Sequence, residues 1–322
     1  AVKKLAYALA AGATVVLKPS PASPFSAQLI VRAAAEAGIP EGVVSLVLGG
    51  GGVGAALTSD TRIAAISMTG STSTGRAIAA AAAPRFARLQ LELGSNNPAI
   101  VLGDADIAHT AASLVSGSMK LSGQWCEAPR HVFVERQIHD ALVAALEAEL
   151  AGLVIGPSTD DATTLGPVAF AGRRDELHAQ RDALVAAGAR AVEVGTPPTA
   201  GCFVISTLIV GERLAPTNEI FGPLLLVEAV DSAAEAIELA NTGAVGLAGY
   251  VYTRDLDAGR ALGTELIAGE VKLNGSSVLD MAPGSSQSFF GSSGIGGHGD
   301  RELLEFFTGV QVIGTDMPGL PL

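Results

Sequence analysis

Short runs of β-branched and aliphatic residues alternate with alanine-rich segments from about residue 13 to residue 93 of this chain. The runs lie at residues 14–17, 43–48 and 63–68, and the segments between them have helical length. Parallel strands are usually buried on both faces and joined by a helical crossover. The alternation therefore predicts βαβ units, and hence an α/β fold with a parallel sheet.

Helix start signals support this interpretation. Ser23 and Ser71 stand where N-cap residues are expected, before segments 25–37 and 73–82. A second alternating region begins near residue 97. Its predicted strands are residues 99–102, 131–134, 224–230, 248–252 and 270–273, and its predicted helices include residues 138–150 and 173–187. The Gly- and Ser-rich segment 284–299 is predicted to be a loop.

Composition narrows the classes of partner. The chain has 322 residues and is 48% hydrophobic, which is enough for two domains with their own cores. Its formal net charge of −12 disfavours nucleic acid and anionic membranes, and leaves small soluble ligands. No apolar stretch of about 18 or more residues is free of charges and turn formers, so no membrane span is expected.

Only two cysteines occur, Cys126 and Cys202, and they are too far apart to suggest a disulfide framework. A reducing, cytoplasmic compartment is the default expectation for such a chain. No cluster of Cys and His has the spacing of metal ligands, so we predict no metal site.

The N-terminus has two interpretations. Lys3 and Lys4 precede an apolar run at residues 5–11, as in a signal peptide. The chain begins with Ala rather than Met, however, and residues 12–18 have the pattern of a turn that enters a buried strand. We therefore interpret this end as the interior of a longer protein.

The most specific feature is Gly123-Gln124-Trp125-Cys126, with Glu92 lying 34 residues upstream in an apolar run. A lone cysteine in an apolar chain is usually a small core residue, and this is our interpretation of Cys202. A catalytic thiol needs a base or a positive field, because at an ordinary pKa of about 8.5 little of it is ionised. A buried carboxylate such as Glu92 needs either an ion-pair partner or a chemical task.

The segments 91–94 and 123–126 resemble signatures of the NAD(P)-dependent aldehyde dehydrogenase superfamily, with Asn97-Pro98 and Ala128 also in register. The resemblance implies that Cys126 is the nucleophile and that Glu92 is its base. Thiolate attack on an aldehyde, hydride transfer to NAD or NADP, and Glu92-assisted hydrolysis of the thioester would then give a carboxylic acid. The backbone N–H of Cys126 is an expected donor to the oxyanion.

Three further segments extend the resemblance. Residues 14–20 are similar to the family's cofactor-ribose strand, residues 69–75 to its pyrophosphate turn, and residues 219–223 to the segment that holds the nicotinamide ribose. The residues so implied in cofactor binding are Lys18, Ser20, Pro21, Gly51, Gly70, Ser71, Leu93, Glu219 and Phe221.

Two further details concern cofactor binding: a glycine-rich turn and the residue that bears on the choice between NAD and NADP. Residues 49–54 match the dinucleotide pattern Gly-x-Gly-x-x-Gly, but four consecutive glycines match it easily, so we give this turn a supporting role. Pro21 stands where NAD-preferring members often carry a Glu that accepts from the ribose hydroxyls. Without that carboxylate a 2′-phosphate meets less repulsion, which favours acceptance of NADP.

We expect three parts: a partial NAD(P)-binding domain at residues 1–93, a catalytic domain at residues 94–288, and a closing and oligomerisation segment at residues 289–322. The site should lie between the first two. By resemblance, residues 310–313 form the last strand of an oligomerisation arm, and its exposed edge would favour association or disorder. We expect a full-length protein of this kind to be a homodimer or homotetramer.

Substrate recognition is less constrained. Trp125, Phe289 and Phe290 are expected to line the substrate pocket, although Trp125 is nearly as well explained as a core residue. Segment 288–294 resembles the family's closing motif only loosely, which leaves the aldehyde open.

The resemblance also implies that family members begin before the position of Ala1. A chain that truly starts there should have weak or absent activity, because part of the dinucleotide fold and one oxyanion donor would be missing.

Two other functions stay open. Relatives without the Glu transfer the acyl group to coenzyme A, and the presence of Glu92 argues against that outcome. A catalytically inert fragment or assembly partner with the same fold is the alternative from another class, and the retained Cys126–Glu92 pair argues against it.

Overall fold

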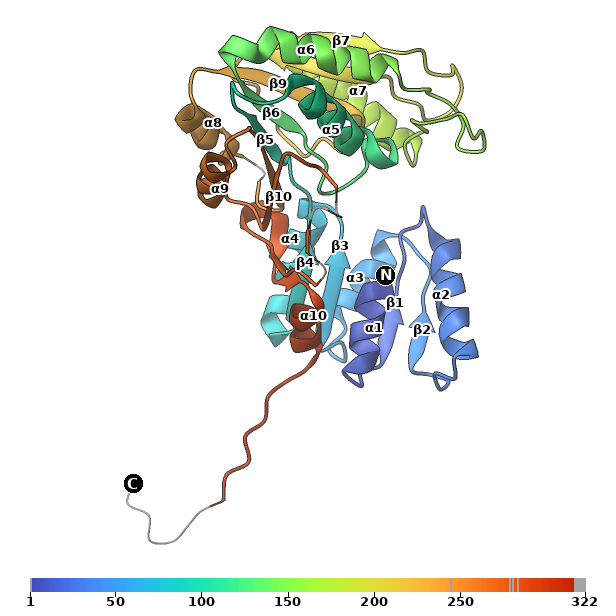
Figure 1. The fold of residues 1–322 in the computed structure, drawn as a ribbon. Coiled ribbons are helices and arrows are strands. Elements are labelled where there is room, and N and C mark those ends of the chain that lie inside the picture. Colours follow the sequence, from blue (N-terminus) through green and yellow to red (C-terminus); the bar gives the residue numbers. More distant parts are fainter. Residues whose placement is uncertain (1, 244, 278, 280, 283, 316–322) are drawn as a thin grey trace, which may run out of the picture.

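The computed structural model describes residues 2–243, 245–277, 279, 281–282 and 284–315 (Figure 1). The dominant feature is a seven-stranded sheet in the order β11-β10-β5-β6-β9-β8-β7, in which every neighbouring pair is parallel except β7 and β8. Its strands are β5 (Pro98–Val101), β6 (His131–Glu135), β7 (Arg190–Val194), β8 (Ser206–Gly211), β9 (Leu224–Val230), β10 (Ala248–Tyr252) and β11 (Glu270–Leu273). The predicted α/β class and all five strands predicted for this region are confirmed, whereas β7 and β8 had not been predicted.

Helices cover both faces of this sheet, because successive strand residues point to opposite sides. Val132 and Val134 of β6 belong to one core, which α5 and α6 complete, while Phe133 points into a second core with α8 and α9. A third core lies between α7 and the β8–β9 pair. The helices are α5 (Ile107–Met119), α6 (Arg136–Ala151), α7 (Ala171–Ala186), α8 (Ala233–Ala240) and α9 (Leu256–Glu265).

The first 93 residues form smaller sheets. Strands β1 (Val15–Leu17) and β2 (Val44–Leu46) pair in parallel, and β3 (Ala65–Thr69) pairs in parallel with β4 (Arg88–Glu92). No ladder joins the two pairs within the described residues, so the predicted parallel sheet is present in two pieces. The helices of this region are α1 (Val2–Ala10), α2 (Pro24–Glu36), α3 (Gly51–Ser59) and α4 (Thr72–Ala82).

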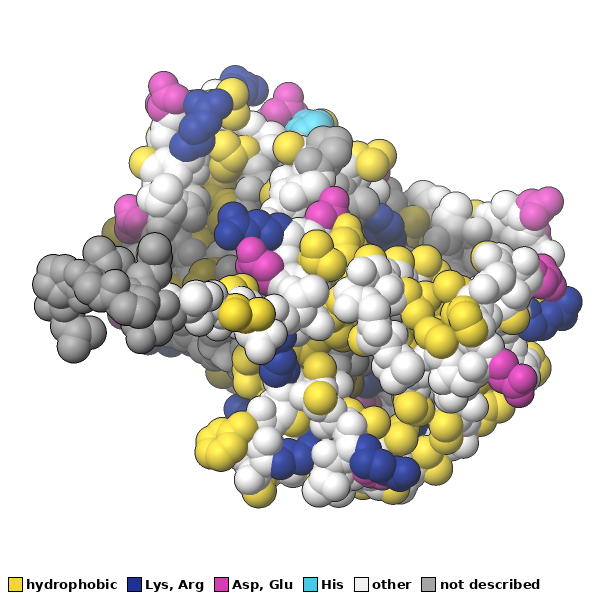
Figure 2. Space-filling view, turned by 90° about the horizontal axis from the view of Figure 1, so that it is seen from below, with side chains coloured by type: hydrophobic (Ala, Val, Ile, Leu, Met, Phe, Trp, Pro, Cys, Tyr) yellow, Lys and Arg dark blue, Asp and Glu magenta, His cyan; other side chains and the backbone are white. Residues whose placement is uncertain are grey.

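Apolar side chains remain exposed in this region. Val16, in the middle of β1, is 42% exposed, and Phe25 and Leu29 of α2 are 77% and 62% exposed. Figure 2, which views the molecule from below, shows hydrophobic side chains over much of that face. Parallel strands are normally covered on both faces, whereas here the middle of β1 is left partly exposed.

The prediction that residues 284–299 form a loop is wrong in part. The segment contains β12 (Gln287–Ser288), η4 (Gly291–Ser293), β13 (Gly294–Ile295) and β14 (Gly297–His298). Strand β13 adds to the β3–β4 sheet antiparallel to β4, and β14 pairs with β12. These two-residue strands lack a hydrophobic period because backbone pairing with distant segments, rather than burial of one face, defines them.

The first and last helices of the described chain are in contact. Helix α10 (Asp300–Phe307) follows β14 and packs against α1, as Figure 1 shows. Residues 310–313 were expected to be a strand, but they adopt no regular structure, and Val310 is 98% exposed. Nothing among the described residues pairs with them, and a strand requires a partner. The last part of the predicted segment 289–322, residues 316–322, lies outside the described residues.

The helices of the described chain include none that is long and apolar enough to cross a membrane.

Candidate active site

Cys126 follows an unusual turn. Leu121, Ser122 and Gly123 all have left-handed backbone conformations, with φ values of 52°, 57° and 72°. A side chain at Gly123 would meet the carbonyl of Gly222 at about 2.3 Å, so only glycine fits there. The turn lies in η2 (Lys120–Gly123), and Cys126, with its half-buried thiol, follows three residues after it.

Two buried polar side chains hold this turn. The Asn97 amide donates to the carbonyls of Cys126 and Ala128, both at 2.8 Å. The Arg130 guanidinium, 1% exposed, donates to the carbonyls of Ser118 (3.0 Å) and Gly222 (2.7 Å), and also to that of Gly123. Backbone carbonyls that would otherwise be buried without partners are thereby satisfied. Asn97 was predicted only as part of a motif, and Arg130 was not predicted as a site residue.

Glu92 ends β4 and faces the thiol. The Cys126 thiol points at Oε1 of Glu92, with an Sγ–Oε1 distance of 3.9 Å. The other oxygen, Oε2, accepts from the Thr69 hydroxyl at 3.2 Å and lies 3.8 Å from both Lys4 Nζ and His298 Nδ1. The structure thus brings together Cys126 and Glu92, which were predicted to act as a pair, and places Thr69, Lys4 and His298, which were not predicted as catalytic residues, beside Glu92.

The charges of this cluster oppose one another. Burial works to raise the pKa of Glu92, but the interactions with His298, Lys4 and Thr69 outweigh it, so the pKa lies below its usual value. Burial, together with the negative charges of Glu92, Glu127 and Glu219, raises the pKa of Cys126 to about 12. At rest, therefore, the pair consists of a neutral thiol and an ionised carboxylate that can accept its proton.

Glu219 reaches the same region from the loop before β9. The backbone N–H of Ser95 donates to Oε1 of Glu219 at 3.3 Å, and Asn96 exchanges two hydrogen bonds with the backbone of residues 218 and 220. A side chain at Gly94 would lie 1.8 Å from Oε2 of Glu219, so the carboxylate occupies space that only glycine leaves free. Burial raises the pKa of Glu219.

Of the remaining predicted cofactor residues, Gly70, Ser71 and Leu93 lie beside Glu92. Gly70 donates its backbone N–H to the carbonyl of Glu92 at 3.0 Å, and the Ser71 hydroxyl caps α4 by accepting from the N–H of Thr74. Leu93 follows Glu92 and is buried. Phe221 lies next to the Arg173 guanidinium, 5.5 Å from the ring centre.

The other four lie on the β1–β2 side. Lys18 follows β1, and its Nζ donates to the carbonyl of Pro19 at 2.9 Å. The Ser20 hydroxyl accepts from the N–H of Ala22, Pro21 is exposed, and Gly51 begins α3. The structure therefore does not bring these four into contact with the catalytic pair.

The predicted substrate-pocket residues differ in their placement. Phe289 is buried, with its ring edge-on to His298 at 5.7 Å, whereas Phe290 is 45% exposed. Trp125 has the ammonium of Lys120 over its ring at 4.5 Å and that of Lys272 at 5.8 Å. Lys272 is fully buried and forms ion pairs with Glu127, at 3.6 Å, and Glu270. This buried group of three charged residues, one of which directly follows Cys126 in the sequence, was not predicted either.

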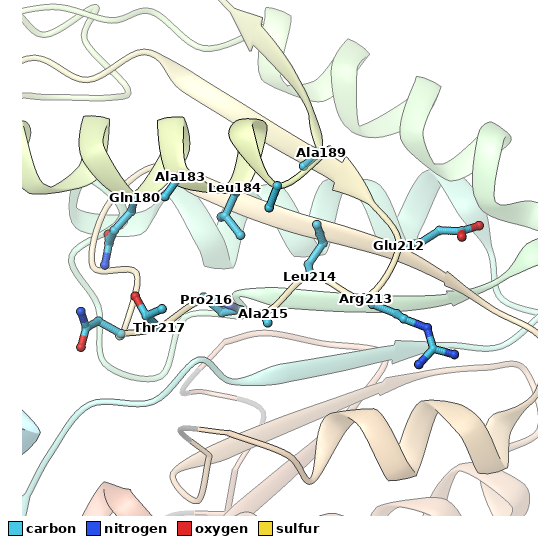
Figure 3. A pocket seen from close by; sticks show the side chains of 12 residues that line it. Gln180, Ala183, Leu184, Ala189, Glu212, Arg213, Leu214, Ala215, Pro216 and Thr217 are labelled. Carbon is cyan, nitrogen blue, oxygen red and sulfur yellow. The ribbon is translucent and has the colours of Figure 1, made fainter.

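A cavity of about 270 Å³ lies between α7 and residues 212–218 (Figure 3). None of the predicted site residues lines it. Its wall includes Gln180, whose amide donates to the carbonyl of Glu219 at 3.0 Å, so the cavity borders the Glu219 segment but not the thiol.

The chain is similar to known proteins along its length. It is 36% identical over 301 residues to a betaine aldehyde dehydrogenase of Sinorhizobium fredii, and 32% identical over 329 residues to a succinate-semialdehyde dehydrogenase of Paenarthrobacter nicotinovorans. These matches cover 89% and 99% of this chain but 61% and 72% of the relatives. The chain thus spans roughly two thirds of the length of these curated relatives.

Solved structures show the same similarity. A Mycobacterium tuberculosis aldehyde dehydrogenase complexed with NAD+ superposes with a TM-score of 0.91 at 34% identity, covering 95% of this chain and 64% of the other. An NADP-dependent enzyme of E. coli superposes with a TM-score of 0.89 at 31% identity, covering 95% and 64%. The model of the aldehyde dehydrogenase family matches residues 1–313. The chain therefore belongs to the aldehyde dehydrogenase family.

Proposed function

We propose that this chain carries the catalytic centre of an NAD(P)-dependent aldehyde dehydrogenase, which oxidises an aldehyde to a carboxylic acid. The observation that carries the proposal is the contact between Cys126 Sγ and Glu92 Oε1 at 3.9 Å. Nucleophile and base commonly lie farther apart without substrate than in the reacting complex. Family membership supports the reaction class, and the residue roles below are part of the proposal.

In the first step Glu92 takes the thiol proton and the sulfur of Cys126 attacks the carbonyl carbon, giving a tetrahedral adduct with a negative oxygen. The thiol cannot ionise unaided at neutral pH, because its pKa is about 12. The backbone N–H of Glu127 stabilises the sulfur anion. The backbone N–H of Cys126 is the proposed donor to the oxyanion.

In the second step the adduct loses hydride and becomes a thioester on Cys126. In the third step water must hydrolyse this thioester to release the acid. Glu92 first loses the thiol proton to solvent and is ionised again. It then accepts a proton from this water, the water oxygen attacks the thioester carbon, and the Cys126–acyl bond breaks as the remaining water proton passes to sulfur and the product leaves as a carboxylate. Hydrolysis by a positioned carboxylate distinguishes this proposal from acyl transfer to coenzyme A.

The residues present fit a nicotinamide dinucleotide, which when bound supplies the hydride acceptor. The N-terminus of α4, with its N–H groups beyond the Ser71 cap, is suited to a pyrophosphate and follows directly on the strand next to Glu92. Glu219 is held against Gly94, where its carboxylate can accept from ribose hydroxyls, and Phe221 lies close by in sequence. Lys18, Ser20, Pro21 and Gly51 are proposed to hold the adenosine end.

The choice between NAD and NADP belongs to the proposal as well. Pro21 places no carboxylate where a 2′-phosphate would meet it, so we expect dissociation constants for NAD and NADP within about tenfold of each other, by titration calorimetry. An NAD affinity far above that for NADP would contradict the expectation for Pro21 while leaving the reaction intact.

The reaction itself is tested by incubating the chain with NAD or NADP and a set of aldehydes that includes betaine aldehyde and succinate semialdehyde. Formation of reduced cofactor with the free acid as product is expected, and only at a low rate from a chain that starts at Ala1. Cys126→Ser should abolish turnover and Glu92→Gln should lower it by about 10²–10⁴. Cys202→Ser, which alters the other cysteine, is the matched control and should retain activity. Turnover by Cys126→Ser would overturn the proposal, and a coenzyme A thioester as product would replace hydrolysis by acyl transfer.

Assembly and location complete the proposal. We infer that the protein forms a homodimer or homotetramer and acts in the cytoplasm, with the exposed apolar surfaces of α2 and residues 310–313 contributing to association. Light scattering that gives a single-chain mass at micromolar concentration would contradict the assembly.

A further inference from the structure

The residues on either side of the nucleophile both have side chains directed at one buried cation. Cys126 and Glu127 are the central residues of a turn that the N–H of Ala128 closes by donating to the carbonyl of Trp125, at 3.1 Å. Lys272 Nζ lies 3.6 Å from Oε2 of Glu127 and 5.8 Å from the centre of the Trp125 ring. Both distances are within the range of electrostatic attraction. A single ammonium group thus holds the side chain before Cys126 and the side chain after it.

The seven-stranded sheet fixes the position of this ammonium group. Lys272 of β11 stands opposite Tyr250 of β10 in their parallel ladder. The hydroxyl of Tyr250 donates to the carbonyl of Glu127, and the ammonium of Lys272 faces the carboxylate of the same residue. Two neighbouring strands therefore hold Glu127, one by its backbone and the other by its side chain.

The three charges of this group do not cancel. The side chain of Lys272 is fully buried, and it also forms an ion pair with Glu270 on its own strand. One ammonium therefore faces two carboxylates, and a buried carboxylate without a counter-charge is costly. Oε2 of Glu127 accepts no hydrogen bond within the described part of the chain. The position of this oxygen consequently depends on its attraction to Lys272.

The direction of the Glu127 carboxylate matters for the thiol. Its charge acts on Cys126 and contributes to the raised pKa of the thiol. Glu92 faces the same thiol from β4, with 3.9 Å between Sγ and Oε1. Because Glu127 is attracted toward Lys272 on β11, Glu92 remains the carboxylate at which the thiol points.

We propose that Lys272 is a positioning residue for the nucleophile, which keeps the Cys126 thiol directed at Glu92 by holding the side chains of Trp125 and Glu127. The inference rests on the proposed function and deepens it. It gives a buried cation of β11 a role in the acylation step, in which Glu92 takes the thiol proton as sulfur attacks the carbonyl carbon. The action of Lys272 passes through the turn at residues 125–128 rather than through contact with the substrate.

The test uses the 322-residue chain without cofactor and compares two reactions of Cys126. In acetylation by p-nitrophenyl acetate, the sulfur–carbon bond forms, the bond to p-nitrophenolate breaks, and Glu92 takes the thiol proton. This reaction requires the thiol to be directed at its base. Iodoacetamide alkylates whatever thiolate is present, so its rate follows the pKa of Cys126. Mass spectrometry of the Cys126 peptide follows both reactions.

Glu127→Gln breaks the ionic contact with the nucleophile turn while Lys272 keeps Glu270 as its counter-charge. Loss of the Glu127 charge lowers the pKa of Cys126, so alkylation at pH 8 should be faster than in the native chain. Acetylation at the same pH should nevertheless be slower, by about tenfold or more, because the thiol is no longer held toward its base. A change in the thiol pKa alone would move both rates in the same direction.

Lys272→Met removes the cation itself. The ratio of the acetylation rate to the alkylation rate should again fall by about tenfold or more. Arg190→Met is the matched control, because it removes the cation of an exposed ion pair, 3.9 Å from Glu147, on the edge strand β7. It should leave both reactions unchanged. Thermal unfolding verifies that each variant is folded, and if Lys272→Met is not, Glu127→Gln decides alone.

The outcomes separate the two proposals. If the native chain is never acetylated on Cys126, the proposed function fails at its nucleophile. If the native chain is acetylated and a folded variant of Glu127 or Lys272 keeps the native ratio of the two rates, the role of Lys272 is overturned while the proposed function stands. Acceleration of both reactions in Glu127→Gln leads to the same conclusion, because the carboxylate would then act through its charge alone.

Discussion

The thiol of Cys126 is surrounded by groups that keep it protonated. Burial removes the water that would solvate a thiolate, and three carboxylates, those of Glu92, Glu127 and Glu219, add negative charge nearby. Many reactive cysteines have lowered pKa values and stay ionised. Here the pKa is about 12, so the thiol should become nucleophilic only when its proton is passed to Glu92 in the presence of substrate.

Alkylation by iodoacetamide measures this resting state. At pH 8 we expect Cys126 to react at least about a hundredfold more slowly than a free thiol of ordinary pKa, because so little thiolate is present. The rate should still rise between pH 8 and pH 10 as the thiolate fraction grows. Glu92→Gln removes one of the opposing negative charges and should accelerate labelling even though it impairs turnover. A rate that reaches a plateau below pH 9 in the native chain would show that the thiol is already activated.

Gly94 offers a second test at this scale. In Gly94→Ala the new methyl group would lie 1.8 Å from Oε2 of Glu219, so the carboxylate must leave its place beside Ser95. We expect the dissociation constant for NAD or NADP to rise by about tenfold or more, as a lost charged hydrogen bond would produce. Gly309→Ala, at a position with no atom near the added methyl group, should change nothing. Unchanged cofactor binding in Gly94→Ala would remove Glu219 from the proposed site.

At the scale of the elements, a buried ion pair connects β11 with the loop that contains Cys126 and Glu127. Lys272 of β11 pairs with Glu127 and Glu270, and the Tyr250 hydroxyl of β10 donates to the carbonyl of Glu127. Burial and the nearby Glu270 raise the pKa of Glu127, and Lys272 opposes that rise. Breaking a buried ion pair by removing one partner is strongly destabilising, since a charge is left without compensation.

Lys272→Met should therefore lower the free energy of unfolding by about 3–5 kcal/mol at pH 8, measured by urea denaturation. An acid whose pKa is raised on folding binds protons more readily when folded, so stability is lost as pH rises from the unfolded pKa of about 4.3 to the folded pKa. Without Lys272 the pKa of Glu127 rises further, so the destabilisation should be smaller at pH 5 than at pH 8. Lys3→Met, at a half-exposed pair with Asp300, should cost little at either pH. Equal losses for Lys272→Met at both pH values would contradict the ionic explanation.

Some elements could be predicted from the sequence and others could not, for physical reasons. The strands from β5 to β11 that carry unbroken apolar runs could be predicted because burial on both faces leaves that pattern. In contrast, β13 and β14 have two residues each and no apolar period, and their partners lie far away in sequence. Cys126 and Glu92 could be paired because each sits in a local motif. Lys4 and His298 could not, because only the meeting of α1 with α10 and β14 brings them to Glu92.

At the scale of the whole molecule, the strands of the first 93 residues are less buried than the central strands of the seven-stranded sheet. Strands β6 and β9 are buried along nearly their whole length in the seven-stranded sheet. Strands β1 and β2 have three residues each, and their middle residues are exposed. Local opening is easiest where few apolar contacts and exposed backbone hydrogen bonds hold a segment. The proposed adenosine end of the cofactor site therefore lies beside strands that should open more easily than β6 and β9.

Amide hydrogen exchange should show this difference directly. We expect amides of β6 and β9 to be protected at least about a hundredfold more than those of β1 and β2. Because a ligand that binds only the folded state stabilises it, saturating NAD or NADP should raise protection in β1, β2 and the first turn of α4 while leaving β6 and β9 nearly unchanged. Helix α9, which contributes no proposed cofactor residue, serves as the internal control. Equal protection in both halves would show that the β1–β2 pair is stabilised by contacts beyond its short ladder. A cofactor response confined to the seven-stranded sheet would place the dinucleotide away from Lys18 and Ser71.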